Sequence, residues 1–205
     1  MSYYYKKTPF FIRWIYSKAT WRKETTEKVL YLTFDDGPNN GVTPFVLDIL
    51  KKYHARATFF CLGYNASMNP HLVEEIRNDG HTIGNHSFSH LNGFRTKRNP
   101  YLEDVKRADE IINSKFFRPP YGKMKLKQYN KLKNIFNIIM WDVMSGDFDV
   151  TIDGNKCFDN VVKHARSGSI IVFHDSEQAY DRLKIALPKV LEYYSKLGYK
   201  FENLT

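Results

Sequence analysis

Four short polar clusters of this 205-residue chain hold residue types that could do chemistry together. They combine carboxylates, imidazoles and one guanidinium, and we find them just after apolar runs. The clusters are Asp35-Asp36-Gly37-Pro38, Asn85-His86-Ser87-Phe88-Ser89-His90, Arg118-Pro119-Pro120-Tyr121-Gly122 and His174-Asp175. If the fold brings them together, such residues can hold a metal ion and move protons.

The first two clusters together fit a metal site. Two adjacent carboxylates, Asp35 and Asp36, repel each other, so a cation is expected beside them. His86 and His90 can offer two imidazole nitrogens to one metal, and a carboxylate oxygen would complete a three-ligand site with a position open for water. That ligand set suits Zn²⁺, and also Co²⁺, Ni²⁺ or Fe²⁺. Either pattern alone is weaker evidence for a metal site, because an isolated pair of histidines is often accidental and Asp-Asp-Gly-Pro is often a plain turn.

Alternating strand and helix patterns must position these clusters. Runs rich in β-branched and aromatic residues predict buried strands over 29–34, 57–62, 135–141 and 169–173. Helical patterns fall between them, at 43–53, 69–78, 101–113 and 181–196. Successive βα units predict an α/β fold with a parallel sheet, either open or closed as a barrel. In both architectures the carboxyl ends of the strands collect the reactive residues.

Composition narrows the class of protein. The 31 basic and 22 acidic residues leave a formal charge of +9, which could attract polyanions. The basic residues are scattered and no recognition motif accompanies them, so no specific nucleic-acid partner is expected. No apolar run is long enough for a transmembrane segment. Cys61 and Cys157 lie too far apart for a zinc ribbon or a redox motif, and we expect both to be buried and reduced.

Residues 1–28 do not follow the alternation of strand and helix patterns and form an N-terminal lead segment. We expect its aromatic-rich part, Tyr3 to Trp21, to dock against the domain. The segment lacks the apolar core of a secretory signal, so the sequence by itself indicates the cytoplasm. The remaining histidines have no partner motif, and we interpret them as surface or capping residues: His54, His71, His81 and His164.

The clusters, in this order, resemble the motifs of polysaccharide deacetylases with a NodB homology domain, carbohydrate esterase family 4. The strings Thr33–Pro38, His86–His90 and Arg118–Gly122 carry the resemblance, with weaker motifs at Trp141–Phe148 and Ile170–Asp175. The similarity covers about residues 29–203 and implies that residues 29–205 form a catalytic domain, a distorted (β/α) barrel. It also implies metal-dependent removal of acetyl groups from amino sugars or acylated glycans.

The resemblance assigns roles to individual residues. Asp36, His86 and His90 correspond to the metal ligands, and Asp35 to the general base that acts on a metal-activated water. Arg118 corresponds to the residue that orients the base, a role suited to its planar charged group. The backbone N–H of Tyr121 corresponds to an oxyanion donor and places Tyr121 at the substrate. The preceding Pro119-Pro120 pair, with φ near about −65°, would hold that N–H rigidly.

An amine leaves poorly unless it is protonated, so N-deacetylation needs an acid, and His174 fits that need. Trp141 and Phe173 could form the walls of an acetyl pocket, although aromatic residues after buried strands are often plain core. One position departs from the family pattern. A carboxylate usually holds the acid histidine three positions after the tryptophan, where this chain has Met144, so Asp142, Asp147 or Asp175 must substitute or the partner is missing.

Several functions fit these residues. The leading hypothesis is a metal-dependent N-deacetylase on GlcNAc-type sugars of peptidoglycan or chitin-like oligomers, with zinc as the first choice of metal and cobalt or nickel as alternatives. O-deacetylation, as of acetylated xylan, needs the same metal and base. A catalytically impaired glycan-binding homologue is the third reading, motivated by Met144. The resemblance would place the protein in the cell envelope or outside the cell, and the sequence does not predict an oligomeric state.

Overall fold

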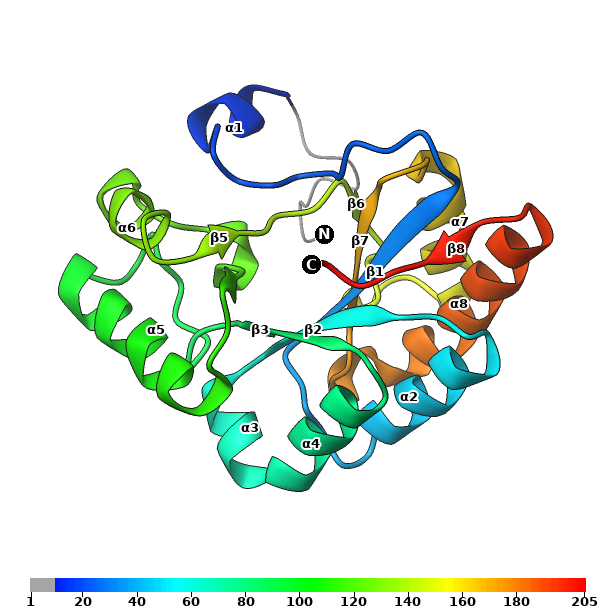
Figure 1. The fold of residues 1–205 in the computed structure, drawn as a ribbon, viewed down its shortest axis with the longest axis horizontal. Coiled ribbons are helices and arrows are strands. Elements are labelled where there is room, and N and C mark those ends of the chain that lie inside the picture. Colours follow the sequence, from blue (N-terminus) through cyan, green and yellow to red (C-terminus); the bar gives the residue numbers. More distant parts are fainter. Residues whose placement is uncertain (1–9) are drawn as a thin grey trace.

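The computed structural model describes residues 10–205, which fold into a curled parallel sheet surrounded by helices (Figure 1). Its elements are α1 (Phe10–Ile15), β1 (Val29–Asp35), α2 (Thr43–Lys52), β2 (Ala57–Cys61), α3 (Gly63–Met68), α4 (Pro70–Asn78), β3 (Thr82–Asn85), α5 (Arg98–Ile112), β4 (Phe116–Phe117), a 3-10 turn η1 (Pro120–Gly122), α6 (Leu126–Leu132), β5 (Asn137–Ile138), β6 (Val143–Met144), α7 (Gly154–His164), β7 (Ile170–His174), α8 (Glu177–Lys196) and β8 (Lys200–Phe201).

The strand order explains why distant polar clusters meet. The sheet runs β5-β4-β3-β2-β1-β7-β6, all pairs are parallel, and β8 adds to the start of β1. Asp35, the last residue of β1, is in register with Phe60 on one side and His174 on the other. Because parallel strands end at the same edge, the residues that follow β1, β3, β4 and β7 gather there. The distorted (β/α) barrel expected from the resemblance is confirmed.

The main core lies between the sheet and the helices that cover it. Leu32 and Phe34 of β1 point into this layer, where Phe34 stacks on Phe59 and Phe173 with ring centroids 5.0 and 6.1 Å apart. On the other side of the sheet, Phe60 of β2 packs in a smaller cluster inside the curled sheet. A strand that is covered on both faces has a nearly continuous apolar sequence, and for this reason the central strands could be predicted.

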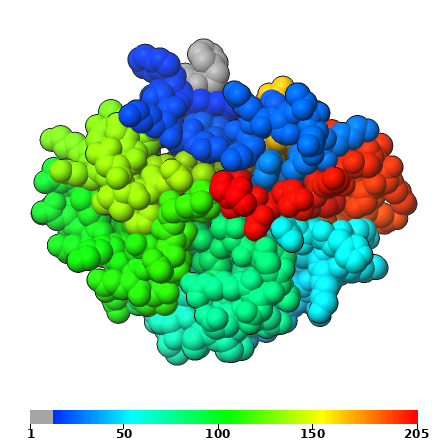
Figure 2. Space-filling model, in the orientation of Figure 1, coloured from blue at the N-terminus to red at the C-terminus, as the bar shows by residue number. Residues whose placement is uncertain are grey.

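The described part of the N-terminal segment docks on the barrel, as expected. Tyr16 and Trp21 are buried against residues 124–140, and the N–H of Thr20 donates to Ile138 O at 2.8 Å. The N–H of Lys23 donates to Gly168 O at 2.9 Å. Figure 2 shows this segment in blue, lying against the yellow-green part of the chain. Residues 20–23 therefore lie over the seam between β5 and β6, the two ends of the sheet. The expectation for residues 3–9 falls outside the described part of the chain.

Some sequence-based boundaries were wrong. The apolar run 135–141 forms only β5, because Ile135 is 68% exposed and the chain then crosses from β5 to β6.

The expectation that His81 lies at the surface was also wrong: its ring is buried and its Nδ1 accepts the N–H of Ala57 at 3.2 Å. Cys61 and Cys157 are free and buried, as predicted. Within residues 10–205, no helix is long and apolar enough to cross a membrane.

Candidate active site

Three of the predicted ligands converge at the carboxyl edge of the sheet. One ligand atom from each of Asp36, His86 and His90 lies within 4.8 Å of the other two. Asp36 Oδ1 is 3.2 Å from His90 Nε2 and 3.6 Å from His86 Nε2. This oxygen is buried and has no hydrogen-bond partner in the described chain. An orphaned carboxylate oxygen that faces two imidazole nitrogens fits a divalent metal with two histidines and one carboxylate as ligands.

The protonation states suit the same role. His86 Nδ1 lies 2.8 Å from Arg118 O, so the N–H belongs on Nδ1 and the lone pair on Nε2 faces Asp36. Burial lowers the pKa of His86 to about 4, which keeps the imidazole neutral. Burial alone would raise the pKa of Asp36, but its contact with His90 and the charges of His174 and His86 outweigh this effect and hold the pKa below its ordinary value.

Hydrogen bonds to the side chains of Asn85 and Asp104 hold the loop that carries the two histidines. The N–H of Ser87 donates to Asn85 Oδ1 at 2.8 Å, and the N–H groups of Phe88 and Ser89 both donate to Asp104 Oδ2, at 3.0 and 3.1 Å. Asp104 lies on α5, outside every polar cluster singled out above. Ser87 and His90 have positive φ angles of 66° and 56°. Residues other than glycine keep a positive φ only where surrounding contacts stabilise it, and these hydrogen bonds provide that stabilisation.

Asp35 and Arg118 form a buried ion pair beside the metal ligands. Arg118 Nη1 donates to Asp35 Oδ1 at 2.7 Å and to Thr33 Oγ1 at 2.7 Å. Its Nη2 donates to Met140 O at 3.0 Å, and its guanidinium lies 4.1 Å above the Phe60 ring. The side chain is fully buried, so its orientation is fixed and Asp35 is presented toward the open edge of the site.

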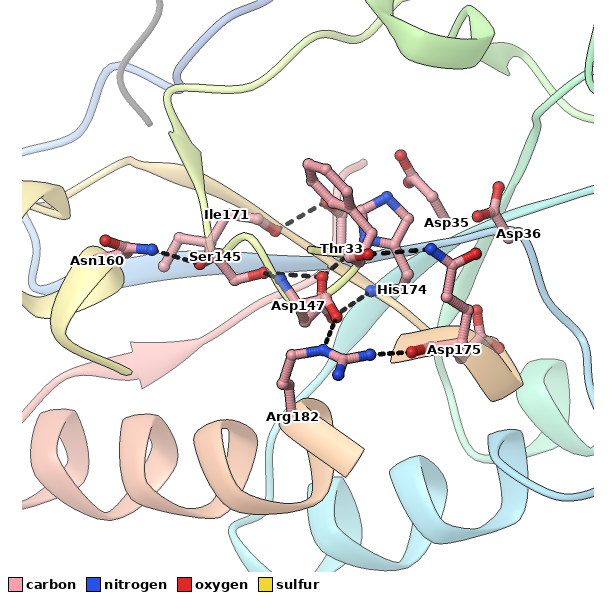
Figure 3. A network of polar contacts seen from close by, with 12 residues as sticks. Thr33, Asp35, Asp36, Ser145, Asp147, Asn160, Ile171, His174, Asp175 and Arg182 are labelled. Atoms are coloured by element: carbon pink, nitrogen blue, oxygen red, sulfur yellow. Dashed lines mark hydrogen bonds and ion pairs between the residues drawn. The ribbon is translucent and has the colours of Figure 1, made fainter. Parts of the chain in front are cut away.

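His174 has a carboxylate partner, and it is Asp147. His174 Nδ1 lies 2.8 Å from Asp147 Oδ1, and the backbone N–H of His174 donates to Asp147 Oδ2 at 2.8 Å (Figure 3). Ser145 Oγ donates to the same Asp147 Oδ1 at 3.0 Å. Burial would lower the pKa of His174, but Asp147, aided by Asp36 and Asp35, raises it to about 9. The imidazole is therefore protonated at neutral pH.

The other candidate partners of His174 are engaged elsewhere. Met144 is buried in β6, in register with Val172, so no partner is missing from the site on account of Met144. Asp142 pairs with Arg13 at 2.6 Å and accepts from Ser169. Asp175 accepts from Thr43 Oγ1 at 2.6 Å and from Gly37 N at 3.0 Å. A Cβ at position 37 would lie 1.9 Å from Asp175 Oδ2, so the loop after Asp36 closes on Asp175 only because residue 37 is glycine.

Aromatic side chains flank the polar groups. Tyr121 is 56% exposed, has a φ of 59°, and its ring lies 4.5 Å from that of His90. The Trp141 ring packs so closely on Gly122 that a Cβ there would come within 2.5 Å of it. The Phe148 ring meets His174 edge-on at 5.3 Å. Of the two alternatives for Phe173, core applies and pocket wall does not, because its ring is fully buried against Phe34 and reaches no open surface.

Comparison with known proteins agrees with this geometry. The sequence model of the polysaccharide deacetylase family matches residues 22–135. The chain belongs to this family. A peptidoglycan-N-acetylglucosamine deacetylase of Bacillus cereus is 34% identical to this chain, over 91% of each chain. The peptidoglycan-N-acetylmuramic acid deacetylase PdaA of Bacillus subtilis is 30% identical, over 88% of this chain and 71% of its own.

A similar structure has been determined by crystallography. It is a peptidoglycan N-acetylglucosamine deacetylase in complex with 4-naphthalen-1-yl-N-oxidanyl-benzamide, 32% identical, with a TM-score of 0.88 over 96% of this chain and 95% of the other. In this chain, the sequence predicted the metal-ligand, base and acid residues of the clusters but indicated no role for Asp104, Thr33 and Asn85. Asp104 sits in a helical pattern that gave no sign of it. Thr33 and Asn85 stand next to Phe34-Asp35 and His86, and their positions in the clusters were the available signal.

Proposed function

We propose that this protein hydrolyses the N-acetyl group of GlcNAc-type sugars in peptidoglycan with the help of one divalent metal ion. Zinc is the first choice of metal, and cobalt and nickel are alternatives. The observation that carries the proposal is the placement of Asp35 and the protonated His174 beside the Asp36–His86–His90 cluster. The names of the similar proteins supply the substrate class.

The metal would be held by Asp36, His86 and His90. When bound, such an ion lowers the pKa of a water molecule and polarises the acetyl carbonyl. Asp35 accepts the proton of the attacking water, and its ion pair with Arg118 holds the carboxylate in position for this step. The backbone N–H of Tyr121 donates to the oxygen that gains negative charge. In this proposal the loop at Tyr121 also forms one wall of the substrate site.

His174 completes the reaction as the acid. The imidazolium donates its Nε2 proton to the amine nitrogen as the carbon–nitrogen bond breaks, while Asp147 holds the ring at Nδ1. An alkoxide leaves more readily than an amine, so an O-acetyl esterase would gain less from a histidine held in the charged form. The raised pKa of His174 therefore favours N-deacetylation over O-deacetylation. Phe148 lies beside His174 and Trp141 lies against Gly122, next to Tyr121, and both rings are proposed to contact the acetyl methyl group.

The test is acetate release from N-acetylated peptidoglycan strands, N-acetylchitooligosaccharides and acetylated xylan, each before and after chelation. We expect release from the first two, loss on chelation, and recovery with Zn²⁺, Co²⁺ or Ni²⁺. Mass spectrometry of muramidase digests identifies the deacetylated sugar. Release from xylan alone would reject N-deacetylation. Release from no substrate under any metal would support an inactive, glycan-binding homologue.

A further inference from the structure

Two segments that leave the active site, each a loop with the first residues of the helix that follows it, carry six basic residues and no carboxylate. The first follows His90 and the second follows Tyr121. Residues 80–102 and 111–141 contain neither aspartate nor glutamate. All six basic side chains are exposed, and we call them the basic strip: Arg95, Lys97, Arg98, Lys123, Lys125 and Lys127.

The fold holds the two loops side by side. Gln128, at the start of α6, is fully buried and its Nε2 donates to Gly93 O at 3.1 Å and to Thr96 O at 3.2 Å. Lys125 Nζ donates to the same Thr96 O at 2.9 Å. A Cβ at Gly93 would lie 2.3 Å from Lys123 O, so the backbones touch. The basic strip is therefore one surface built from two chain segments.

This surface begins at the catalytic residues. The rings of His90 and Tyr121 lie 4.5 Å apart, and each loop runs outward from one of them. Lys123 is two positions after Tyr121 and Arg95 five after His90, so at about 3.3–3.6 Å per residue both lie within a few sugar lengths of the site. Exposed apolar side chains lie among the charges: Phe94 is 52% exposed, Tyr121 56% and Leu126 55%.

The charges are not neutralised within the protein. In the part of the chain that the structure describes, no ion pair involves a residue of the basic strip. Arg98 Nε contacts the neutral Asn99 side chain, and Lys125 contacts a backbone carbonyl. The Asp104 carboxylate on α5 accepts the N–H groups of Phe88 and Ser89, which precede His90. An unneutralised basic surface attracts anions.

We infer that the basic strip binds the carboxylates of an acidic glycan whose acetylated sugar lies in the active site. This inference rests on the proposed function and refines its substrate class. A peptidoglycan strand carries carboxylates next to its N-acetyl groups, on the lactyl group where this is free or on the peptide attached to it, whereas a chitin-like strand is neutral. Exposed rings contact the apolar faces of sugars and the strip contacts their charges. The surface starts at the reacting residues, so its occupant is a continuation of the substrate.

The test compares charged and neutral substrates, of which the free and the amidated peptidoglycan strands share the same sugars. Peptidoglycan strands with free carboxylates are compared with the same strands after amidation and with N-acetylchitooligosaccharides. One variant is Lys123→Gln/Lys127→Gln and another is Arg95→Gln/Lys97→Gln. The control variant is Lys51→Gln/Lys163→Gln, which removes the same charge from exposed positions on α2 and α7.

For each strip variant we expect kcat/KM on free-carboxylate strands to fall roughly 3–10-fold at low salt, through KM, with the difference shrinking as salt rises. On amidated strands the strip variants and the control should match the wild type within about two-fold. Equal losses on charged and amidated strands, or no loss on either, would overturn the inference.

Binding measurements separate this inference from the proposed function. If no substrate releases acetate, the affinities of the wild type for free-carboxylate and amidated strands still decide whether the strip recognises carboxylates. A short single-stranded oligonucleotide is the competing polyanion. Tighter binding of the oligonucleotide than of the acidic strands at about 0.15 M salt would reject a glycan as the occupant.

Discussion

Both oxygens of the Asp147 carboxylate hold His174, Oδ1 at the ring Nδ1 and Oδ2 at the backbone N–H, each at 2.8 Å. This arrangement fixes the position of the ring and its charge together. It also answers the question raised by Met144, since the carboxylate that the histidine needs comes from three residues farther along the same loop. Ser145 and Arg182 support that loop, through Asp147 Oδ1 and Asp147 O.

The first prediction concerns the pH dependence of activity. Asp147 raises the pKa of His174 to about 9, so activity that requires the protonated imidazole should decline as pH rises through about 9. In Asp147→Asn the charged form loses its partner, the pKa falls, and the alkaline limb of kcat/KM moves to lower pH. The pH–rate profiles of the two proteins provide the measurement.

Met144→Leu is the matched control, because it keeps an apolar side chain in β6 and should leave the limb in place. Met144→Asp should not move the limb upward, since the imidazole already has its partner, and a buried charge there should reduce activity. An alkaline limb that Asp147→Asn leaves unmoved would contradict the role of Asp147.

The second prediction separates the paired aspartates. Asp35→Asn should retain the metal and lower turnover by roughly 10²–10⁴, the usual contribution of a general base. Asp36→Asn should weaken metal binding itself, because Asp36 Oδ1 faces both imidazoles. Elemental analysis gives the metal content of each variant, and the turnover numbers give its activity. Normal metal content together with normal activity in both would mean that the two roles are wrongly assigned.

The third prediction is one divalent ion per chain. His86→Ala and His90→Ala should each lose it on dialysis, because each leaves only two of three protein ligands. His71→Ala, which changes an exposed histidine on α4, is the control and should retain the ion. Full metal content in both ligand variants would refute the site.

The fourth prediction concerns Asp104. Asp104→Ala should lower metal affinity by roughly ten-fold, because the loop between the two histidines loses the acceptor of two backbone N–H groups. Asp109→Ala is the control: Asp109 lies on the same helix and accepts the N–H of Ser114, away from the histidines. Both variants should lower the melting temperature, but only the first should change the metal Kd. Equal metal affinities in the two variants would mean that Asp104 only stabilises α5.

The ligand-bearing clusters were predictable because their signals are local. An apolar run followed by Asp35-Asp36 identifies a strand end, and parallel topology then places His86 and His90 at the same edge. The partner of His174 could not be assigned, because Asp142, Asp147 and Asp175 all lie close enough in sequence. Only the path of the loop between β6 and α7 selects Asp147.

Other features depend on contacts between residues far apart in the chain. The contact of Asp104 with the histidine loop comes from the packing of α5 on α3 and β3, which helical periodicity does not specify. The same reason applies to Phe173. Its place after an apolar run was compatible with a pocket wall, but β7 alternates and turns this ring toward the helices. The short strands β4, β5 and β6 have too few residues for a period to be visible.

The seam of the barrel has a consequence for the order of events during synthesis. Thr20 and Lys23 bind Ile138, Met140 and Gly168, so this segment finds its last partner only when residue 168 has left the ribosome. At about 5–20 residues per second, the synthesis of residues 24–168 takes roughly seven to thirty seconds. Until residues 124–140 have been made, Tyr16 and Trp21, buried in the finished protein, lack the surface on which they pack. The hydrogen bonds that join residues 20–23 to both ends of the sheet are thus completed late, and the nascent chain must keep Tyr16 and Trp21 from other partners until residues 124–140 have been made.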